Sequence, residues 1–500
     1  MTMESPKLEW AKEWLKTTKR LYIGGEWKDG STDDRTIDVI NPATGQVLGS
    51  IQEATKENVD LAVAAAQHAF KKGVWPSMGR KERANVMRRI AEVIREHRAE
   101  LATLEALDNG KLYKEAYYDD LGESADIFDY YAGWTDKIHG ETMPVEGEFL
   151  NYTQRVPVGV CGQIVPWNYP MLMSTWKLAP ALATGNTVVL KPSSATPFSV
   201  VRLFEILHDE KLLPQGVINL ILGSGKTGSF ISSHAGVDKV SFTGSTAVGK
   251  QLVHDSANSN LKTVTLELGG KSPNIIFNDP PDVEYAIERS FTGLFTHKGE
   301  KCSSPTRLFV HKSLYEYAVS RLAELADRYV LGDPFDPRSD QGAQCTESHM
   351  ESILEYIEIG KAEGARVAAG GVRDMNGSNA NGYFIRPTIL ADVKNNMRVA
   401  QEEIFGPVLV VIPFDQDEEV IEMANDTIYG LAAGLWTKDI TRAHRVAARL
   451  DAGAVFINKY GCYDLASPFG GFKQSGWGKE CGIQSLDSYT KVKSIWVNLN

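Results

Sequence analysis

One cysteine and one glutamate have sequence contexts that suit covalent chemistry. Cys302 lies in the stretch FTHKGEKCSSPTR, with three basic residues before the thiol and one after it. Nearby positive charge favours the thiolate, the nucleophilic form of cysteine, so this context predicts a reactive thiol. Glu267 ends the apolar alternating run TVTLE, just before a Leu-Gly-Gly break. A carboxylate that closes an apolar strand can keep a raised pKa and serve as a general base.

Each of these residues also has a simpler explanation. A single cysteine is usually an inert buried residue, and Glu267 could accept a hydrogen bond from a buried backbone amide. The role of Cys302 or Glu267 cannot be inferred from that residue alone, so we consider both together with the motifs elsewhere in the chain.

Short motifs recur along nearly the whole chain in a fixed order. They are PWNYP at 166–170, KPS at 191–193, FTGSTAVG at 242–249, ELGGKSPN at 267–274, Cys302, QEEIFGPV at 401–408 and SPFGGFKQSGWGKE at 467–480. With these motifs in this order, the chain resembles the aldehyde dehydrogenase superfamily. It is most similar to the hydrolytic, tetramer-forming branch of that family.

Length and charge restrict the class of protein. A chain of 500 residues is too long for one core, so two or three domains are expected. The formal net charge of −11 disfavours nucleic acid and anionic membrane as partners. We find no apolar run of the roughly 18–20 residues that a membrane helix needs. The first twenty residues lack an apolar signal core and predict a short surface helix.

The cysteines give no sign of a disulfide framework or a metal site. They are scattered at positions 161, 302, 345, 462 and 481, without Cys-x-x-Cys or Cys/His ligand spacing. The sequence therefore predicts no metal, a reducing compartment and a cytoplasmic location.

The fold class is indicated by short apolar runs that alternate with helical patterns. Strand candidates lie at 159–167, 186–192, 216–223, 239–245 and 263–270, and helix candidates lie between them at 171–184, 198–211, 227–235 and 247–257. Such alternation predicts a parallel sheet with helices on both faces, followed here by a second α/β region. The fold class is therefore α/β with two successive α/β regions, and the resemblance implies that the first is a Rossmann-like dinucleotide-binding domain and the second a catalytic domain.

The resemblance assigns these regions to domains. It implies a dinucleotide-binding domain at 1–135 and 155–266 and a catalytic domain at 267–477. It also implies a small projecting β element at 136–154 and 478–500 that pairs subunits in a homotetramer, a dimer of dimers. A terminal strand with an open edge would need covering, which agrees with subunit pairing.

Two glycine-rich turns, 223–228 and 244–249, each follow a strand candidate and precede a helix candidate. Glycine there lets the backbone approach a phosphate at a helix N-terminus. The resemblance implies NAD or NADP as cofactor and places the pyrophosphate on the second turn. The cofactor-binding residues that it implies are Trp167, Lys191, Ser194, Gly244, Ser245, Gly249, Glu403 and Phe405.

Ser194 departs from the family pattern. NAD-preferring members usually carry a glutamate at this position, where it accepts hydrogen bonds from the adenosine ribose and repels a 2′-phosphate. Serine does neither strongly, so the preference between NAD and NADP stays open.

The resemblance also implies a reaction. Cys302 would attack an aldehyde, Asn168 and the Cys302 backbone N–H would hold the oxyanion, and Glu267 would activate water to hydrolyse the resulting thioester. Lys177 and Glu480 match a proton route from the base to solvent, for which a plain salt bridge is the alternative. By position, the substrate tunnel would be lined by Tyr169, Met173, Trp176, Phe295, Tyr463 and Phe469.

Two other functions remain open at this point. A catalytically silent homologue, such as a lens crystallin, would keep the fold without needing Cys302, Glu267 and Asn168 together. A redox-independent cysteine hydrolase would need a histidine partner for the thiol, and His297 is near in sequence. The aromatic tunnel suits apolar aldehydes or a quaternary ammonium group, and the sequence does not decide between them.

Overall fold

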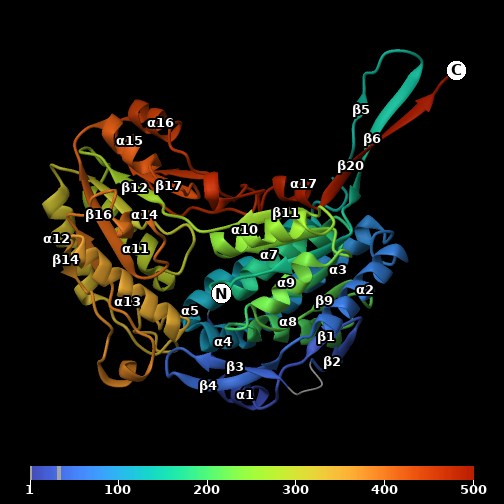
Figure 1. Cartoon of the computed structure of the whole chain (residues 1–500), viewed down its shortest axis with the longest axis horizontal. Helices are drawn as coiled ribbons and strands as arrows, with labels where there is room; N and C mark the ends of the chain where they lie inside the picture. Colours follow the sequence, from blue (N-terminus) through green and yellow to red (C-terminus); the bar gives the residue numbers. More distant parts are fainter. Residues whose placement is uncertain (1–2, 31–34) are drawn as a thin grey trace.

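The protein has two α/β lobes and a projecting β arm (Figure 1). The computed structural model describes residues 3–30 and 35–500. The predicted α/β class, with two successive α/β regions, is confirmed.

The sheet of the first lobe is mostly parallel and is buried at its centre. Its strand order is β19 (Gly476–Trp477), β11 (Thr263–Glu267), β10 (Lys239–Thr243), β7 (Val160–Ile164), β8 (Thr187–Lys191), β9 (Ile218–Leu220), β1 (Leu21–Ile23) and β2 (Glu26–Lys28). Strands β7, β8 and β10 are buried along their whole length. Helices therefore cover both faces of the sheet at these strands.

The helices of the first lobe form two layers around this sheet. Helices α2 (Lys56–Lys71), α9 (Gly225–Ser233) and α10 (Thr246–Ala257) pack against one another on one face. Helix α7 (Pro170–Ala183) covers the other face, together with α3 (Arg80–Glu96), α6 (Leu121–Ala132) and α8 (Phe198–Asp209). The remaining elements of this lobe are α1 (Leu8–Trp14), β3 (Thr36–Asn41), β4 (Gln46–Gln52), α4 (Arg98–Asn109), α5 (Tyr113–Glu115), the π-helix η1 (Ala116–Asp120) and α17 (Gln484–Ser488).

The sheet of the second lobe has the order β14 (Arg366–Ala369), β15 (Thr388–Ala391), β16 (Val408–Phe414), β13 (Arg307–His311), β12 (Pro273–Ile276), β17 (Ala432–Trp436) and β18 (Ala454–Ile457). Its helices are α11 (Val283–Phe295), α12 (Tyr315–Arg328), α13 (Glu347–Ala362), α14 (Arg398–Gln401), α15 (Asp417–Asn425) and α16 (Ile440–Ala447), with short 3-10 turns η2 (Thr296–Gly299), η3 (Gly377–Asn381) and η4 (Lys473–Ser475). For this region the sequence suggested elements at RPTILADV, PVLVVIPF and AGAVFINKY, which contain β15, β16 and β18, but none at β12, β13 or β17.

The chain passes between the lobes at Glu267 and returns beside it. Strand β11 ends at Glu267, and β12 of the other sheet begins at Pro273. After the second lobe, β19 pairs antiparallel with β11, so that Gly476 lies opposite Glu267. The predicted domain boundaries remain predictions, but the crossing point brings one candidate catalytic residue to the junction of the two sheets.

The β arm leaves the first lobe and carries the C-terminus (Figure 1). It consists of β5 (Thr142–Met143), β6 (Phe149–Pro157) and β20 (Thr490–Asn498), with β20 paired along its length with β6. Its apolar side chains Leu150, Trp496 and Val497 are exposed in this single chain. The edge of β20 is unpaired in the described chain, as expected for a strand that is covered by another subunit.

Within the described residues, no helix combines the length and apolarity needed to cross a membrane. The cysteines at 161, 302, 345, 462 and 481 are all free thiols.

A buried ion cluster fixes the helices that face the second lobe. The Lys111 ammonium lies 3.0 Å from Glu105 Oε1, forms an ion pair with Asp120, and sits 4.7 Å from the centre of the Tyr169 ring. All three charged side chains are fully buried. Glu105 also accepts hydrogen bonds from Ser199 Oγ and from the backbone N–H of Met171 at the start of α7. The cluster therefore joins α4, η1, α7 and α8.

We predict that Lys111→Met strongly destabilises the protein. The variant leaves two buried carboxylates without their cation, and removing one partner of a buried ion pair typically costs about 3–5 kcal/mol. Thermal and urea unfolding would measure the loss, with Lys81→Met, at an exposed helix position, as the control. Equal stability of the two variants would contradict this account of the cluster.

Candidate active site

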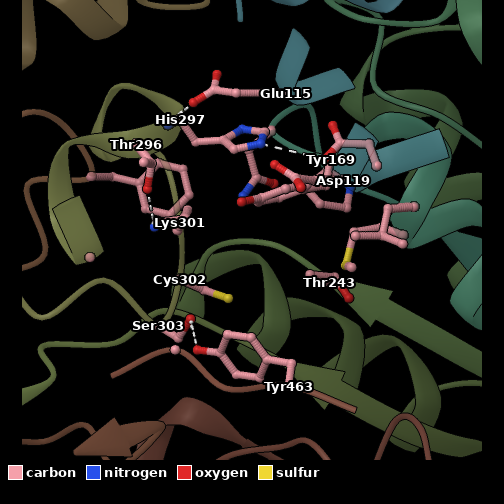
Figure 2. A pocket seen from close by; sticks show the side chains of 18 of the residues that line it. Glu115, Asp119, Tyr169, Thr243, Thr296, His297, Lys301, Cys302, Ser303 and Tyr463 are labelled. Atoms are coloured by element: carbon pink, nitrogen blue, oxygen red, sulfur yellow. Dashed lines mark hydrogen bonds and ion pairs between the residues drawn. The ribbon is translucent and has the colours of Figure 1, made fainter. Parts of the chain in front are cut away.

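The predicted catalytic residues meet in one cavity between the lobes. The cavity has a volume of about 1120 Å³ and is lined by Asn168, Glu267 and Cys302 together. Figure 2 shows the Cys302 thiol in the middle of it, with Tyr463 on one side and Lys301 and Tyr169 on the other. Residues that are 134 positions apart in the sequence, Asn168 and Cys302, therefore share one site.

The segment before Cys302 has an irregular backbone that the first lobe holds in place. His297, Lys298 and Gly299 have φ angles of 54°, 60° and 74°, in the left-handed region. The Lys298 side chain is buried, and its ammonium donates to Asn109 O at 2.7 Å and to Asn109 Oδ1 at 2.9 Å. It also pairs with Glu300 at 2.8 Å. Such left-handed residues are costly for non-glycine types, so the buried contacts must offset that cost.

Glycine at 299 is required by a close backbone approach. A Cβ atom there would lie 2.3 Å from the carbonyl carbon and oxygen of Gly406, in the turn that leads into β16. The thiol segment therefore packs directly on the segment that carries Glu403 and Phe405.

The basic residues near Cys302 do not form the thiolate-stabilising group that the sequence predicts. Lys298 is paired with Glu300, the His297 ring lies 3.4 Å from Asp120, and the Lys301 ammonium donates to Thr296. Burial raises the pKa of the Cys302 thiol to about 12, and the negative charges of Glu267 and Glu403 add to this shift. Because burial outweighs the local positive charge, the resting thiol is protonated and needs a base to activate it.

The Asn168 amide is fixed in orientation by the same segment. It follows β7, in the loop that leads into α7, and its Nδ2 donates to Glu300 O at 2.9 Å. Asn109 Nδ2 donates to the carbonyl of the preceding residue, Trp167, at 2.8 Å. An amide nitrogen carries two hydrogens, so one bond to Glu300 leaves the other hydrogen for the cavity.

Glu267 has the properties of a buried base. It is 6% exposed, and burial raises its pKa well above the usual value, with the negative charge of Glu480 adding to the shift. Its Oε2 has no hydrogen-bond partner among the residues that the structure describes. Lys177 and Glu480 lie nearby as a buried ion pair, with Nζ and Oε1 2.6 Å apart. The pair that the sequence suggested is therefore formed, and its part in proton transfer remains a proposal.

The turn between β10 and α10 has the features of a phosphate-binding site. Ser245 is the N-cap of α10 and accepts from Val248 N, while Gly244 and Ser245 line the cavity. A Cβ at Gly249 would lie 2.7 Å from the Leu268 side chain, so glycine is needed for this helix to pack on the sheet. A 12-residue helix with its N-terminus at a cavity can bind a pyrophosphate.

Glu403 lies where this cavity meets the thiol segment. Its Oε1 accepts from Gly270 N at 2.9 Å, and burial raises its pKa to about 7. Phe405 has a φ of 58° and packs against the Trp167 ring with centroids 5.3 Å apart. Glu403 and Phe405 both line the cavity, where a carboxylate can bind a ribose and an aromatic side chain can contact a flat ring, so these residues suit the nicotinamide half of a dinucleotide.

Lys191 and Ser194 lie outside the cavity, at the end of β8. Burial lowers the pKa of Lys191 to about 8, and its ammonium donates to Pro192 O. Ser194 is half-buried in the following loop. If the pyrophosphate of a dinucleotide binds at α10, Lys191 and Ser194 could contact only its adenosine half.

The predicted tunnel residues are aromatic and mostly lie together. Tyr463 donates to Ser303 Oγ at 2.7 Å, so it is tied to the thiol segment, and Phe469 packs on Trp176 with centroids 5.5 Å apart. The cavity is lined by Tyr169, Met173, Trp176, Tyr463 and Phe469. Phe295 is the exception, because it packs on Phe291 inside the second lobe and does not reach the cavity.

The sequence analysis missed an acidic wall of this cavity. Glu115, Asp119 and Glu123 line it, and their spacing of four residues on a helical segment was the available signal. It also missed His349, which lines the cavity and whose Nε2 lies 2.7 Å from Phe405 O. No motif in the sequence marks that histidine.

Comparisons with known proteins agree with the geometry. The model of the "Aldehyde dehydrogenase family" matches residues 27–495. Human retinal dehydrogenase 2 is 46% identical over 497 residues, covering 99% of this chain and 93% of the relative. An NAD+ complex of a Bacillus cereus aldehyde dehydrogenase has 47% identity and a TM-score of 0.95, covering 100% of this chain and 99% of that one. A P. syringae indole-3-acetaldehyde dehydrogenase, solved with NAD+, has 39% identity and a TM-score of 0.95, covering 98% and 99%.

We predict that alkylation of Cys302 in the cofactor-free protein accelerates steadily with pH. Iodoacetamide reacts with the thiolate, and below a pKa of about 12 the thiolate fraction rises about tenfold per pH unit. Peptide mass spectrometry between pH 6 and 9 would follow Cys302, with the exposed Cys462 as an internal control. A plateau for Cys302 near neutral pH would show that its thiolate is already formed.

Proposed function

Because the chain belongs to the aldehyde dehydrogenase family, we propose that it oxidises an aldehyde to a carboxylic acid with NAD or NADP through covalent bonds to Cys302. This proposal rests on one observation. A single cavity is lined by Cys302, Asn168 and Glu267 and by the turn between β10 and α10.

The first chemical step is carried by Cys302 and Asn168. Once its proton has passed to water, the thiolate attacks the aldehyde carbon and forms a thiohemiacetal with a negative oxygen. The Asn168 amide, held by Glu300 O, and the Cys302 N–H donate to that oxygen. Losing one such donor typically costs about 3–4 kcal/mol of transition-state stabilisation.

The dinucleotide would lie along the other half of the cavity. Gly244, Ser245 and the N-terminus of α10 suit its pyrophosphate, and Glu403 and Phe405 suit its nicotinamide half. Trp167 and Lys191 match the family residues that pack on or bind the adenosine half. A bound nicotinamide supplies the acceptor for the hydride that leaves the thiohemiacetal carbon. The remaining acyl group is then a thioester on Cys302.

Glu267 completes the cycle by activating water. Its unpartnered oxygen and raised pKa suit a group that takes a proton from water in a buried site. A base for water favours a free acid as product over transfer of the acyl group to coenzyme A. Lys177 and Glu480 are proposed to pass the proton onward.

The two alternative functions fit the site less well. A silent homologue has no need for an oriented Asn168 beside Cys302 and Glu267. A triad hydrolase would need a basic histidine hydrogen-bonded to the thiol, whereas the His297 ring packs against the Tyr169 ring with centroids 4.3 Å apart. Burial lowers the pKa of His297 well below its usual value, and the charge of Lys111 lowers it further.

We also propose a homotetramer and a cytoplasmic location. The exposed apolar side chains and open edge of the β arm support pairing with another subunit. Free, scattered cysteines support a reducing compartment. The domain assignment to 1–135 with 155–266, 267–477, and 136–154 with 478–500 belongs to the same proposal.

Cys302→Ala should abolish oxidation of aldehydes and leave dinucleotide binding intact, because the thiol forms the covalent bond and the cofactor contacts lie elsewhere. Loss of such a nucleophile typically costs several orders of magnitude in rate. Absorbance of the reduced dinucleotide with a panel of aldehydes measures activity, and fluorescence titration measures binding. A variant that keeps more than about a tenth of the rate would refute covalent catalysis.

Glu267→Gln should slow thioester hydrolysis more than formation of the first reduced dinucleotide, giving a burst before a slow steady state. The base works only when deprotonated, so hydrolysis in the wild type should slow as pH falls through the raised pKa of Glu267. The variant should lose that pH dependence. Stopped-flow absorbance measures both phases, and equal slowing of the two would assign Glu267 to activation of Cys302 instead.

Wild-type protein should use NADP as well as NAD, and Ser194→Glu should shift the preference toward NAD. The glutamate would repel a 2′-phosphate at a partly exposed position, which is worth roughly 1–3 kcal/mol in the ratio of kcat/KM values. Steady-state kinetics with both cofactors, using Ser194→Gln as the uncharged control, would measure the shift. If Gln and Glu act alike, charge at this position does not select the cofactor.

A further inference from the structure

A stripe of polar side chains runs along strands β10 and β11, from Glu267 at the end of β11 to Lys239 and Thr263 at the start of the two strands. Strands β10 and β11 are parallel, with Lys239 paired to Thr263, Ser241 to Thr265 and Thr243 to Glu267. Side chains on a strand alternate between the two faces, so these six lie on one face and the intervening Val240, Phe242, Val264 and Leu266 lie on the other. A polar stripe inside a covered sheet is unusual, because such faces are normally apolar.

Hydrogen bonds connect this stripe to the Lys177–Glu480 pair. Ser241 Oγ donates to Glu480 Oε1 at 3.3 Å, and Thr265 Oγ1 donates to Ser241 Oγ at 3.3 Å. The Lys239 ammonium donates to Thr265 Oγ1 at 2.7 Å. The result is an unbroken chain of exchangeable protons that ends on the same oxygen that Lys177 contacts.

The chain joins a buried end to an accessible end. Glu480 is 4% exposed and Ser241 is 1% exposed, whereas Thr265 is half-buried and Thr263 is exposed. At the buried end, the backbone of Glu480 pairs with that of Phe469, and a Cβ at the next residue, Gly470, would lie 2.5 Å from Glu267 Oε1. Glu480 is also close enough for its negative charge to raise the pKa of Glu267. The hydroxyls thus connect the neighbour of the base to the half-buried Thr265.

The ionisable groups around the stripe suit proton movement at neutral pH. Burial lowers the pKa of Lys239 to about 8, so it can gain or lose a proton near neutrality. The charged and titratable groups that face Lys239 are Glu480, Lys177 and the Cys161 thiol, with the Tyr489 ring 4.9 Å away.

The proposed reaction has protons to remove. Oxidation of an aldehyde to a carboxylate takes its oxygen from water, the hydride goes to the dinucleotide, and both protons of the water remain. Glu267 takes one of them during thioester hydrolysis, and it must lose that proton before the next turnover.

We propose that Ser241 and Thr265 relay protons from the Glu267–Glu480 region to solvent, with Lys239 as a buried acceptor on the same route. A proton on Glu480 Oε1 passes to Ser241 Oγ, the Ser241 proton passes to Thr265 Oγ1, and the Thr265 proton passes to water or to neutral Lys239. Each hydroxyl gains one proton and gives one, so only the proton's position changes. This inference rests on the proposed function, since it assigns a route to the proton that Glu267 takes.

Removing either hydroxyl tests the relay. Ser241→Ala and Thr265→Val should leave the first-turnover formation of reduced dinucleotide unchanged and lengthen the life of the acyl-enzyme at least about tenfold. Stopped-flow absorbance measures the first quantity, and intact mass spectrometry after rapid quenching measures the second. The solvent isotope effect on acyl-enzyme decay should increase in both variants.

Two further variants separate a relay from a structural role. Thr265→Ser keeps the hydroxyl and should behave as wild type. Thr263→Val makes the same Thr-to-Val change two residues earlier, outside the hydrogen-bonded chain, and should also behave as wild type. Unfolding curves of all four variants show whether any of them has lost stability.

The outcomes distinguish this relay from the function it rests on. Wild-type acyl-enzyme lifetime and isotope effect in Ser241→Ala and Thr265→Val would overturn the relay alone. Equal slowing of both phases, or failure of Thr265→Ser to match wild type, would assign the hydroxyls to structure and also overturn it. A wild-type protein without aldehyde-dependent reduction of NAD or NADP would overturn the proposed function itself.

Discussion

The geometry of the site depends on the contact between the Lys298 ammonium and Asn109. Lys298 lies in the second lobe's thiol segment and bonds to Asn109, at the end of a helix of the first lobe. Asn109 in turn holds Trp167 O, beside the Asn168 amide, and Glu300, the ionic partner of Lys298, provides the carbonyl that Asn168 contacts. A buried charge cannot leave such partners cheaply. The lobes are therefore fixed relative to each other at the thiol.

Burial also sets the charge state of the thiol before ligands enter. The pKa values of Cys302, Glu403 and Lys191 are all shifted toward the neutral form, and in each case desolvation is the main cause. The effect matters most for Cys302, whose thiol is neutral at pH 7, whereas a pKa of about 8 leaves Lys191 mostly charged. A positively charged nicotinamide beside the thiol would oppose this effect, since opposite charge favours the thiolate. The thiol should therefore be more reactive once the dinucleotide is bound.

The sequence predicts much of the fold because its elements have strong local patterns. The alternation from β7 to β11 and the long amphipathic helices are visible in periodicity alone. Strands β12, β13 and β17 were missed because PNII, RLFVH and AAGLW are weak apolar runs. PNII begins with proline and asparagine and AAGLW is mostly alanine and glycine, which are depleted in strands, and RLFVH has charged or polar residues at both ends. Their place in the sheet is set by the strands on either side of them.

The sequence predicted which residues form the candidate site better than it predicted the charges around them. Motif order placed Cys302, Glu267 and Asn168, and the cavity brings them together. The sequence could not show that Lys298 points away from the thiol or that Lys111 is buried between two carboxylates, because those contacts join distant segments.

The contact between Gly299 and Gly406 has an evolutionary consequence. Neither backbone can shift without the other, so homologues that alter one of these turns should carry correlated changes in the other, and the two segments should evolve as a single unit.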